Sequence, residues 1–273
     1  MKLIDCFMYF DEDVVLDLRL NILNNIVDKF VIVESRIDHA GNKKKLNFDI
    51  NKFKIFKDKI TYLVADDLPF RKGIFSTSWR NEPSWLRENF QRNYLLNGFD
   101  KSHDEDFIMI SDIDEIPNPD TINNFNKEKK YACFVQKNFQ SKLNLLNLSE
   151  PNWYGTRICV KKFLKSPQWL RNIKIKKKSF WKFYKPSMPQ LIENGGWHFS
   201  FLKDSSQISD KLKSYAHQEY NNDMINKVEL IEKKIKKGED ILGRNFNYKP
   251  VKIDSSFPKH ILKNLSKLDK WIV

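Results

Sequence analysis

Residues 107–117 of this chain, with the sequence FIMISDIDEIP, combine the pattern of a buried strand with a dense group of acids. The apolar run Phe107–Ile110 contains β-branched residues and predicts a strand that is buried in a sheet. Pro117 predicts that regular structure ends there, because proline cannot donate to a sheet ladder. This stretch therefore favours a core strand whose C-terminal end is strongly charged.

Three acids, Asp112, Asp114 and Glu115, crowd that end of the strand. Neighbouring carboxylates repel one another, and a divalent cation is the usual neutraliser because it prefers hard oxygen ligands. Asp112 and Asp114 are two residues apart, so in an extended segment their side chains point the same way. Open α/β sheets bind ligands at the carboxyl ends of their strands. The pattern predicts a metal carrying a phosphorylated ligand, and an acidic turn with a solvated Glu115 is the alternative.

The first 110 residues alternate between strand and helix patterns. Val14–Val27 has the apolar spacing of an amphipathic helix, and the acids at its start complement the helix dipole. Such alternation predicts an α/β fold in which helices flank a mostly parallel, twisted sheet. The expected strands are Lys2–Phe10, Phe30–Val33, Lys59–Val64 and Phe107–Ile110, and a second helix is expected at Trp85–Leu96.

The second half carries aromatic and basic side chains in its strand patterns. Strands are expected at Ala132–Val135, Trp153–Val160 and Asn172–Phe183, and a helical region is expected over Ser206–Gly238, where Gly238 is the stop signal. The chain contains no Pro/Gly/Ser-rich linker and no internal repeat. We therefore expect one domain spanning residues 1–273.

Composition limits the class of protein further. The net charge of +13 favours an anionic partner such as a nucleotide, a nucleic acid or a membrane surface, although an AT-rich genome would also enrich lysine. No run of eighteen apolar residues and no signal-peptide pattern is present, so we expect a cytoplasmic protein. Cys6, Cys133 and Cys159 fit neither a disulfide framework nor a zinc site, and we expect them to be buried.

Several single residues are weaker candidates for the site. Glu34 ends a predicted strand and could accept hydrogen bonds from a nucleoside, or it could simply mark the strand's exit to solvent. Arg92 and Asn93 lie on a predicted helix and could reach a phosphate or hydroxyl, or they could belong to a solvated helical face. His198 follows two glycines, which allow close backbone approach, and imidazole is a competent ligand for Mn²⁺. A structural role is the alternative for both His198 and His217.

The segment Arg171–Lys185 interleaves lysines with the aromatic residues Phe180, Trp181, Phe183 and Tyr184. This pattern is typical of surfaces that bind single-stranded nucleic acid, an anionic membrane or sugar rings. An amphipathic strand with a solvated lysine face is the alternative.

Taken together, several ordered segments resemble glycosyltransferase family 17, the β-1,4-mannosyl-glycoprotein β-1,4-N-acetylglucosaminyltransferases. The segments are Asp5–Glu12, Leu18–Leu23, Asp28–Gly41, Trp85–Leu95, Ile110–Pro117, Gly195–Phe201 and Ser214–Glu219. Animal members carry a membrane anchor and stem that this chain lacks, so the resemblance suggests a bacterial or viral relative acting on another glycan.

The resemblance implies a GT-A-type fold and an inverting, metal-dependent transfer of N-acetylglucosamine from a UDP-sugar to a glycan acceptor. It implies that residues 1–120 bind the nucleotide-sugar and residues 121–273 bind the acceptor. Asp112 and Asp114 correspond to the Asp-x-Asp motif that binds Mn²⁺ or Mg²⁺, with His198 as a further ligand. Glu34, Arg92, Asn93 and Asp112 would contact the nucleotide-sugar. An inverting displacement also needs a carboxylate base, for which Glu115, Glu193 and Glu219 are the candidates.

Two other functions stay open. A metal-dependent nucleic-acid enzyme would use the acids for two cations and the aromatic–basic segment for the strand. A catalytically inactive glycan-binding relative is disfavoured by the intact acids. We expect no nucleic-acid partner, but we expect a peripheral contact of Lys176, Lys177 and Lys178 with the inner face of the membrane.

Overall fold

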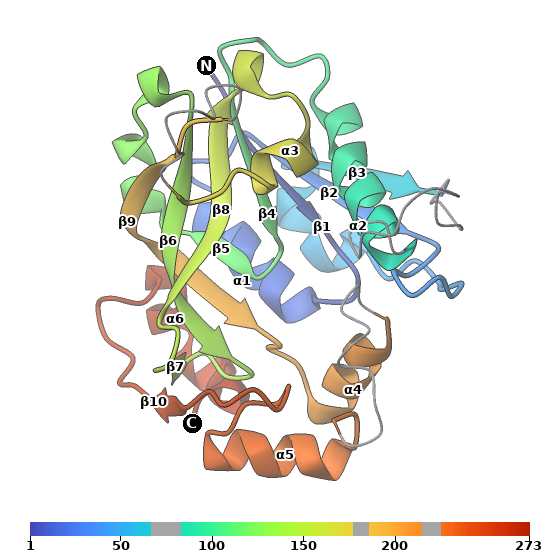
Figure 1. Ribbon diagram of the computed structural model, residues 1–273, viewed down its shortest axis with the longest axis vertical. Helices are drawn as coiled ribbons and strands as arrows, with labels where there is room; N and C mark the ends of the chain where they lie inside the picture. The colour runs from blue at the N-terminus through green and yellow to red at the C-terminus, as the bar shows by residue number, and fades with distance from the viewer. Residues whose placement is uncertain (67–82, 177–185, 215–224) are drawn as a thin grey trace.

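The computed structural model describes residues 1–66, 83–176, 186–214 and 225–273. These residues form an α/β fold built on one large, mixed β-sheet (Figure 1). The strands are β1 Leu3–Met8, β2 Lys29–Ser35, β3 Ile60–Ala65, β4 Phe107–Asp112, β5 Glu115–Pro117, β6 Tyr131–Gln140, β7 Leu145–Asn147, β8 Asn152–Val160, β9 Gln190–Ser200 and β10 Tyr248–Pro250.

The sheet runs in the order β10-β7-β6-β8-β4-β1-β2-β3, and β9 pairs with β6 and β5. Strands β4, β1, β2 and β3 are parallel, whereas β8 lies antiparallel between β4 and β6. The α/β class is therefore confirmed, and the sheet is mixed rather than mostly parallel. The physical reason is the short connection from β6 to β8, since a parallel pair needs a crossover of a dozen or more residues.

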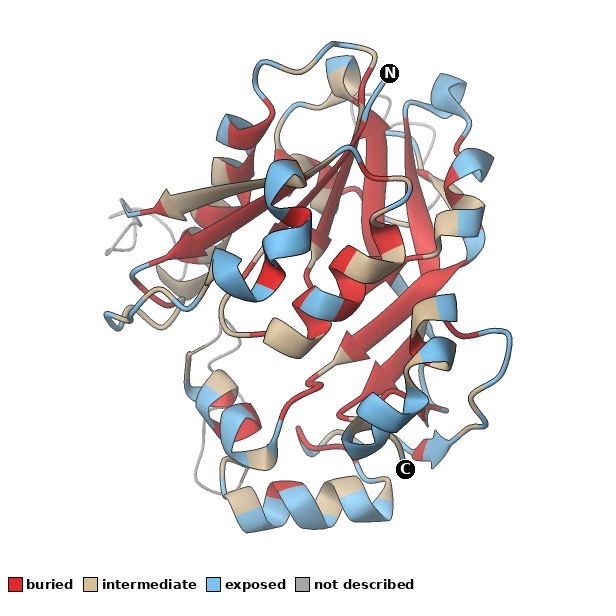
Figure 2. Cartoon of the chain, turned by 180° about the vertical axis from the view of Figure 1, so that it is seen from behind, coloured by how far each residue is buried: buried red, intermediate tan, exposed pale blue. Residues whose placement is uncertain are grey.

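Helices cover both faces of the sheet. Alternate residues of β1 divide between two cores: Leu3 and Phe7 face α1 and α6, while Ile4 and Cys6 face α2 and α3. Figure 2 shows the result, a buried central sheet under helices whose outer faces are exposed. The helices are α1 Asp13–Leu23, α2 Pro83–Tyr94, α3 Pro167–Arg171, α4 Ser205–Ser214, α5 Val228–Lys237 and α6 Lys259–Lys263.

The strand predicted over Asn172–Phe183 is wrong where the structure describes it. Helix α3 ends at Arg171, just before this range, and residues 172–176 contain no strand. Ser166 caps this helix by accepting a hydrogen bond from the backbone N–H of Trp169, and Pro167 occupies the first turn. The predicted region Ser206–Gly238 contains two separate helices, α4 and α5, with residues 215–224 outside the described part.

A small third core joins α4 and α5 at one end of the molecule (Figure 1). It contains Phe201, Ile208, Leu212, Ile231, Ile241 and Leu242. Helix α5 ends at Gly238 in the left-handed conformation, at φ +67°, which confirms the predicted stop. Within the described ranges, no helix is long and apolar enough to cross a membrane. The three cysteines are buried and free, as expected.

Candidate active site

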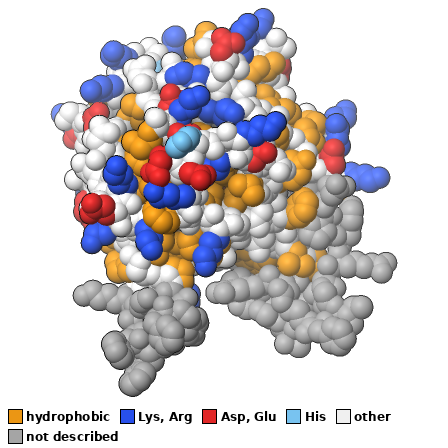
Figure 3. All heavy atoms as spheres, turned by 90° about the horizontal axis from the view of Figure 1, so that it is seen from above, with side chains coloured by type: hydrophobic (Ala, Val, Ile, Leu, Met, Phe, Trp, Pro, Cys, Tyr) orange, Lys and Arg blue, Asp and Glu red, His pale blue; other side chains and the backbone are white. Residues whose placement is uncertain are grey.

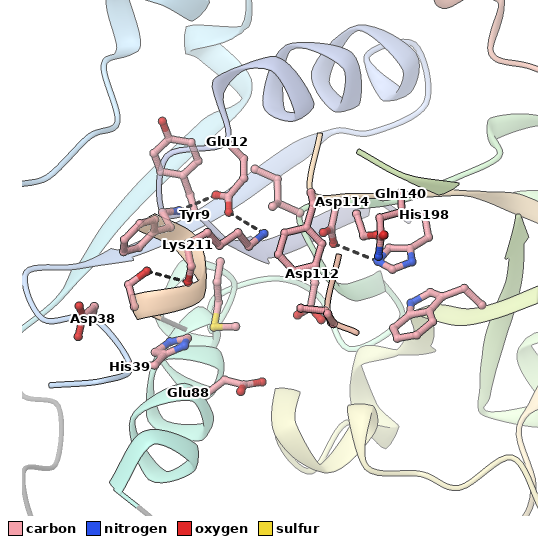
Figure 4. A pocket seen from close by; sticks show the side chains of 18 of the residues that line it. Tyr9, Glu12, Asp38, His39, Glu88, Asp112, Asp114, Gln140, His198 and Lys211 are labelled. Carbon is pink, nitrogen blue, oxygen red and sulfur yellow. Dashed lines mark hydrogen bonds and ion pairs between the residues drawn. The ribbon is translucent and has the colours of Figure 1, made fainter. Parts of the chain in front are cut away.

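A pocket of about 430 Å³ opens where the parallel strands end (Figure 4). Its walls come from the segment after β1, the segment after β2, the inner face of α2, the turn after β4, the end of β9, and α4. This is the edge at which open α/β sheets bind ligands. The lining side chains with ionisable or imidazole groups are Tyr9, Glu12, Asp38, His39, Lys44, Glu88, Arg92, Asp112, Asp114, Glu150, His198, Lys211, Arg244 and Tyr248.

The predicted acidic group lies in this pocket, but its two aspartates have different partners. Ile113 and Asp114 form a turn between β4 and β5, so the segment is not extended and the two side chains do not share one environment. Asp112 accepts a hydrogen bond from Arg92 at 2.9 Å on one oxygen and from Arg171 at 3.0 Å on the other. Burial alone would raise the pKa of Asp112, but Arg171 and Arg92 hold it well below its usual value.

Asp114 lies beside His198, with 3.7 Å between its Oδ1 atom and the imidazole Nε2 atom. The antiparallel pairing of β5 with β9 sets His198 opposite Glu115 and so brings the pair together. The Asp114 carboxylate accepts no hydrogen bond from any residue that the structure describes. Desolvation accordingly raises the pKa of Asp114, with His198 and Lys211 opposing the shift.

Two neighbours fix the orientation of His198. Its Nδ1 atom lies 3.0 Å from Asn138 Oδ1, which can only accept, so Nδ1 donates this hydrogen bond and the Nε2 side of the ring faces Asp114. The indole of Trp153 stacks on the imidazole, with 4.3 Å between ring centroids and 16° between planes. This is the arrangement expected of a metal-ligating histidine whose other nitrogen is held by an acceptor.

The donor set at Asp114 and His198 fits a divalent cation that arrives with a phosphorylated ligand. One carboxylate and one imidazole suit Mn²⁺, and both groups face the pocket. Within the described parts of the chain, no cluster of three or more His, Cys, Asp or Glu side chains is arranged for metal binding. Cations of this kind are often held by one or two protein ligands, with substrate phosphates and water completing the coordination.

Arg19 of α1 anchors the acidic turn Asp112–Glu115 from its buried side. It is completely buried and forms a two-point ion pair with Asp5 of β1, at 2.7 and 2.6 Å. Its remaining N–H groups donate to Ser111 Oγ and to the backbone carbonyls of Asp112, Ile113 and Glu115, at 2.5, 3.3, 3.1 and 2.8 Å. The position of Asp112 and Asp114 therefore depends on one buried guanidinium.

The Glu34 carboxylate is occupied by hydrogen bonds within the protein. It is fully buried and accepts hydrogen bonds from Lys44 Nζ at 2.5 Å, Asn47 N at 2.8 Å, Phe48 N at 3.1 Å and Tyr62 OH at 2.8 Å. Among the described residues that line the pocket, Lys44 is present and Glu34 is not. The contact of Glu34 with a nucleoside stays a prediction, and the geometry shows it holding the 44–48 segment at the pocket edge.

The three carboxylates predicted as bases lie in three different places. Glu115 is buried and already bound by Arg171, Trp153 and the backbone N–H of Asp112. Glu193 is exposed on β9 and does not belong to the described pocket lining. Glu219 lies outside the described residues, as does His217. Neither described candidate has the free, pocket-facing carboxylate that a base needs.

Of the remaining predicted residues, some line the pocket and others do not. Arg92 lines the pocket and also binds Glu88, at 2.6 Å. Asn93 is exposed and accepts from the backbone N–H of Gln168 at 2.9 Å, so it joins α2 to α3. In the segment Arg171–Lys185, Arg171 binds Asp112 and Glu115, and residues 177–185 lie outside the described part of the chain.

Sequence reasoning missed several pocket residues. Glu12, His39, Glu88 and Lys211 all line the pocket. Burial lowers the pKa of His39, whose Nε2 atom lies 2.9 Å from Gln91 Oε1. Arg19 had a readable signal, because it occupies a core-facing position of an amphipathic helix. Asp5 interrupts an apolar strand, and two opposite charges at core positions indicate a buried ion pair.

The model of glycosyltransferase family 17 matches residues 1–252 of the 273-residue chain. No curated protein matches the chain significantly.

Proposed function

The chain belongs to glycosyltransferase family 17, and on this premise we propose that it is a metal-dependent, inverting N-acetylglucosaminyltransferase. Its sugar donor would be UDP-N-acetylglucosamine and its acceptor a glycan. The single observation that carries the metal-dependent part is the Asp114–His198 pair, aimed into a pocket at the carboxyl end of β4. Three parallel strands, β1, β2 and β4, end at this pocket and support a GT-A-type arrangement.

The proposed reaction is one displacement at the anomeric carbon of the sugar. An acceptor hydroxyl oxygen forms the new bond to that carbon from the face opposite the nucleotide. The bond between the anomeric carbon and the diphosphate oxygen breaks, and its electron pair leaves with UDP. The hydroxyl proton passes to a carboxylate of the enzyme. A Mn²⁺ or Mg²⁺ ion held by Asp114 and His198 would supply Lewis-acid stabilisation of the diphosphate charge.

Other residues of the pocket would position the substrates. Asp112 is fixed by Arg92 and Arg171 with 38% of its side chain exposed, so it can still accept a hydrogen bond from a sugar or ribose hydroxyl. Trp153 and Asn138 keep His198 oriented. Side chains that are held in place by such contacts lower the ordering cost at the reaction step.

The proton acceptor is proposed to be Glu150 or Glu219. Glu150 is exposed and lines the pocket, and its backbone carbonyl accepts from the Asn138 side chain at 3.0 Å, close to His198. Glu219 remains a candidate by sequence. The variants Glu150→Gln and Glu219→Gln separate them, because only loss of the true base should lower kcat strongly while UDP affinity stays unchanged.

The structure gives no specific support to the nucleic-acid alternative. Figure 3 shows Lys and Arg side chains spread over one face of the molecule with Asp and Glu side chains among them, not gathered into a continuous basic stripe in its described residues. The proposed peripheral membrane contact rests on Lys174 and Lys176, which are exposed beside α3. Binding to anionic vesicles that weakens with salt would support it, and no binding at low salt would contradict it.

The test of the proposed function combines binding with turnover. UDP with Mn²⁺ should raise the melting temperature of the protein more than GDP, CMP or ADP does, by an amount that grows with ligand concentration. The variant Asp114→Asn should lose Mn²⁺-dependent UDP binding and transfer, whereas the exposed control Asp120→Asn should keep both. Full activity in EDTA would refute metal dependence, and a preference for GDP would refute the nucleotide assignment.

A further inference from the structure

Among the residues that the structure describes, four permanently basic side chains line the pocket, and their partners are unequal. Lys44 lies 2.5 Å from buried Glu34, Arg92 lies 2.6 Å from Glu88 and 2.9 Å from Asp112, and Arg244 lies 2.9 Å from buried Asp240. These three cations are therefore closely matched by carboxylates. The fourth, Lys211, has a looser partner, with 3.2 Å between its Nζ atom and Glu12 Oε1.

Lys211 has hydrogen-bonding capacity left over. Its ammonium carries three N–H donors, and within the described residues Glu12 is its one carboxylate at ion-pair distance. Its other close contact is with the ring of Phe201, whose centroid lies 5.3 Å from Nζ. Only 18% of the side chain is exposed, so the charge is not simply solvated. With respect to the residues that the structure describes, the remaining donors are available to a ligand in the pocket.

Neighbouring carboxylates keep the Lys211 ammonium charged and hold it in position. Burial alone would lower the pKa of Lys211, but Glu12 and Asp114 raise it above its usual value. Glu12 is itself fixed, because its Oε2 atom accepts from the backbone N–H groups of Phe10 and Asp11 at 3.0 and 3.1 Å. In Figure 4 the Lys211 side chain extends from α4 toward Glu12, with Asp114 and His198 farther along the same pocket.

We propose that Lys211 binds the diphosphate of the nucleotide-sugar, as a second positive charge besides the cation at Asp114 and His198. This role rests on the proposed function. A diphosphate offers several anionic oxygens, so one group can satisfy the donors of Lys211 and approach the metal side of the pocket together. The charge of Lys211 then stabilises the UDP leaving group as it gains negative charge. Helix α4 thereby contributes to recognition of the nucleotide's phosphates.

The experiment compares uridine, UMP and UDP as ligands of the wild type and three variants, by calorimetry with Mn²⁺. Lys211→Gln should weaken UDP binding about ten- to a hundred-fold, as expected for a lost charge-assisted hydrogen bond, and leave uridine binding unchanged. Lys211→Arg should retain most of the UDP affinity. Lys213→Gln removes a charge from the same helix, on a side chain that is 57% exposed, and should change nothing.

Each outcome separates the alternatives. Equal weakening of uridine and UDP by Lys211→Gln would overturn the proposal, because it would mean that the residue only supports the pocket wall. Unchanged UDP affinity would overturn it as well. If Lys211→Gln does not fold, Glu12→Gln decides: freeing the ammonium from its carboxylate should preserve or strengthen UDP binding, and a loss would refute the role. A wild type that binds uridine and UDP equally weakly refutes the proposed function itself.

Discussion

The buried ion pair between Arg19 and Asp5 allows a quantitative test of how the acidic turn is held. In the variant Arg19→Met the side-chain volume is roughly kept, but Asp5 is left as an unpaired buried carboxylate. Both side chains are fully buried in the wild type. Removing one partner of such a pair costs about 3–5 kcal/mol of unfolding free energy.

The expected shift in melting temperature follows from the size of the chain. A loss of 1 kcal/mol lowers the melting temperature by about 2–4 °C in domains of this size class, so Arg19→Met should lower it by about 6–20 °C. Urea unfolding followed by circular dichroism measures the free energy directly. The matched control is Arg36→Met, because Arg36 and Asp66 form an exposed pair, 60% and 55% accessible, at 3.3 Å. That variant should cost about 1 kcal/mol or less.

A double variant separates stability from positioning. Replacing both partners, as in Asp5→Leu/Arg19→Met, removes the unpaired charge and should recover much of the lost stability. It should not recover Mn²⁺-dependent UDP binding, because the carbonyls of Asp112, Ile113 and Glu115 still lack their donor. A loss below 1 kcal/mol for Arg19→Met would refute the energetic reasoning. Wild-type UDP affinity in the stable double variant would refute the positioning role.

Three further predictions test other parts of the site. Burial alone would raise the pKa of Glu12, but Lys211 and Lys203 lower it from 4.5 to about 2. The contribution of Glu12 to the free energy of unfolding should therefore be complete above about pH 4.5 and be lost as the pH falls toward 2. In an acid titration, Glu12→Gln should show a shallower loss of stability than the wild type. Asn138→Ala should lower Mn²⁺ affinity about 10–100-fold by releasing His198, measured by Mn²⁺ titration, and an unchanged affinity would contradict the arrangement. Gly196→Ala should unfold at a lower urea concentration than Gly243→Ala. A Cβ atom at Gly196 would lie 2.1 Å from the carbonyl oxygen of Ile116, whereas at Gly243 the nearest atom would be 3.9 Å away. Equal losses of unfolding free energy in the two variants would show that backbone conformation alone sets the cost.

Local sequence pattern was enough for the parallel part of the fold. The apolar runs at Phe30–Val33 and Phe107–Ile110 became β2 and β4, and the helical spacing after β1 became α1. The acidic group was placed correctly at the carboxyl end of β4. These features depend on residues close together in the sequence, where periodicity and charge density carry the information.

Tertiary structure decided which of the charged side chains pair with one another. Asp114 meets His198, 84 positions later in the sequence, only because β5 pairs with β9 in one register. Arg171 reaches Asp112 from the last residue of the capped helix α3, and Lys211 reaches Glu12 because α4 packs back toward the start of α1. Pairing of this kind depends on strand register and on where a helix docks, which are set by the burial of whole faces. Local pattern names the charged residues, but long-range packing decides which of them neutralise one another and which remain free to bind a ligand.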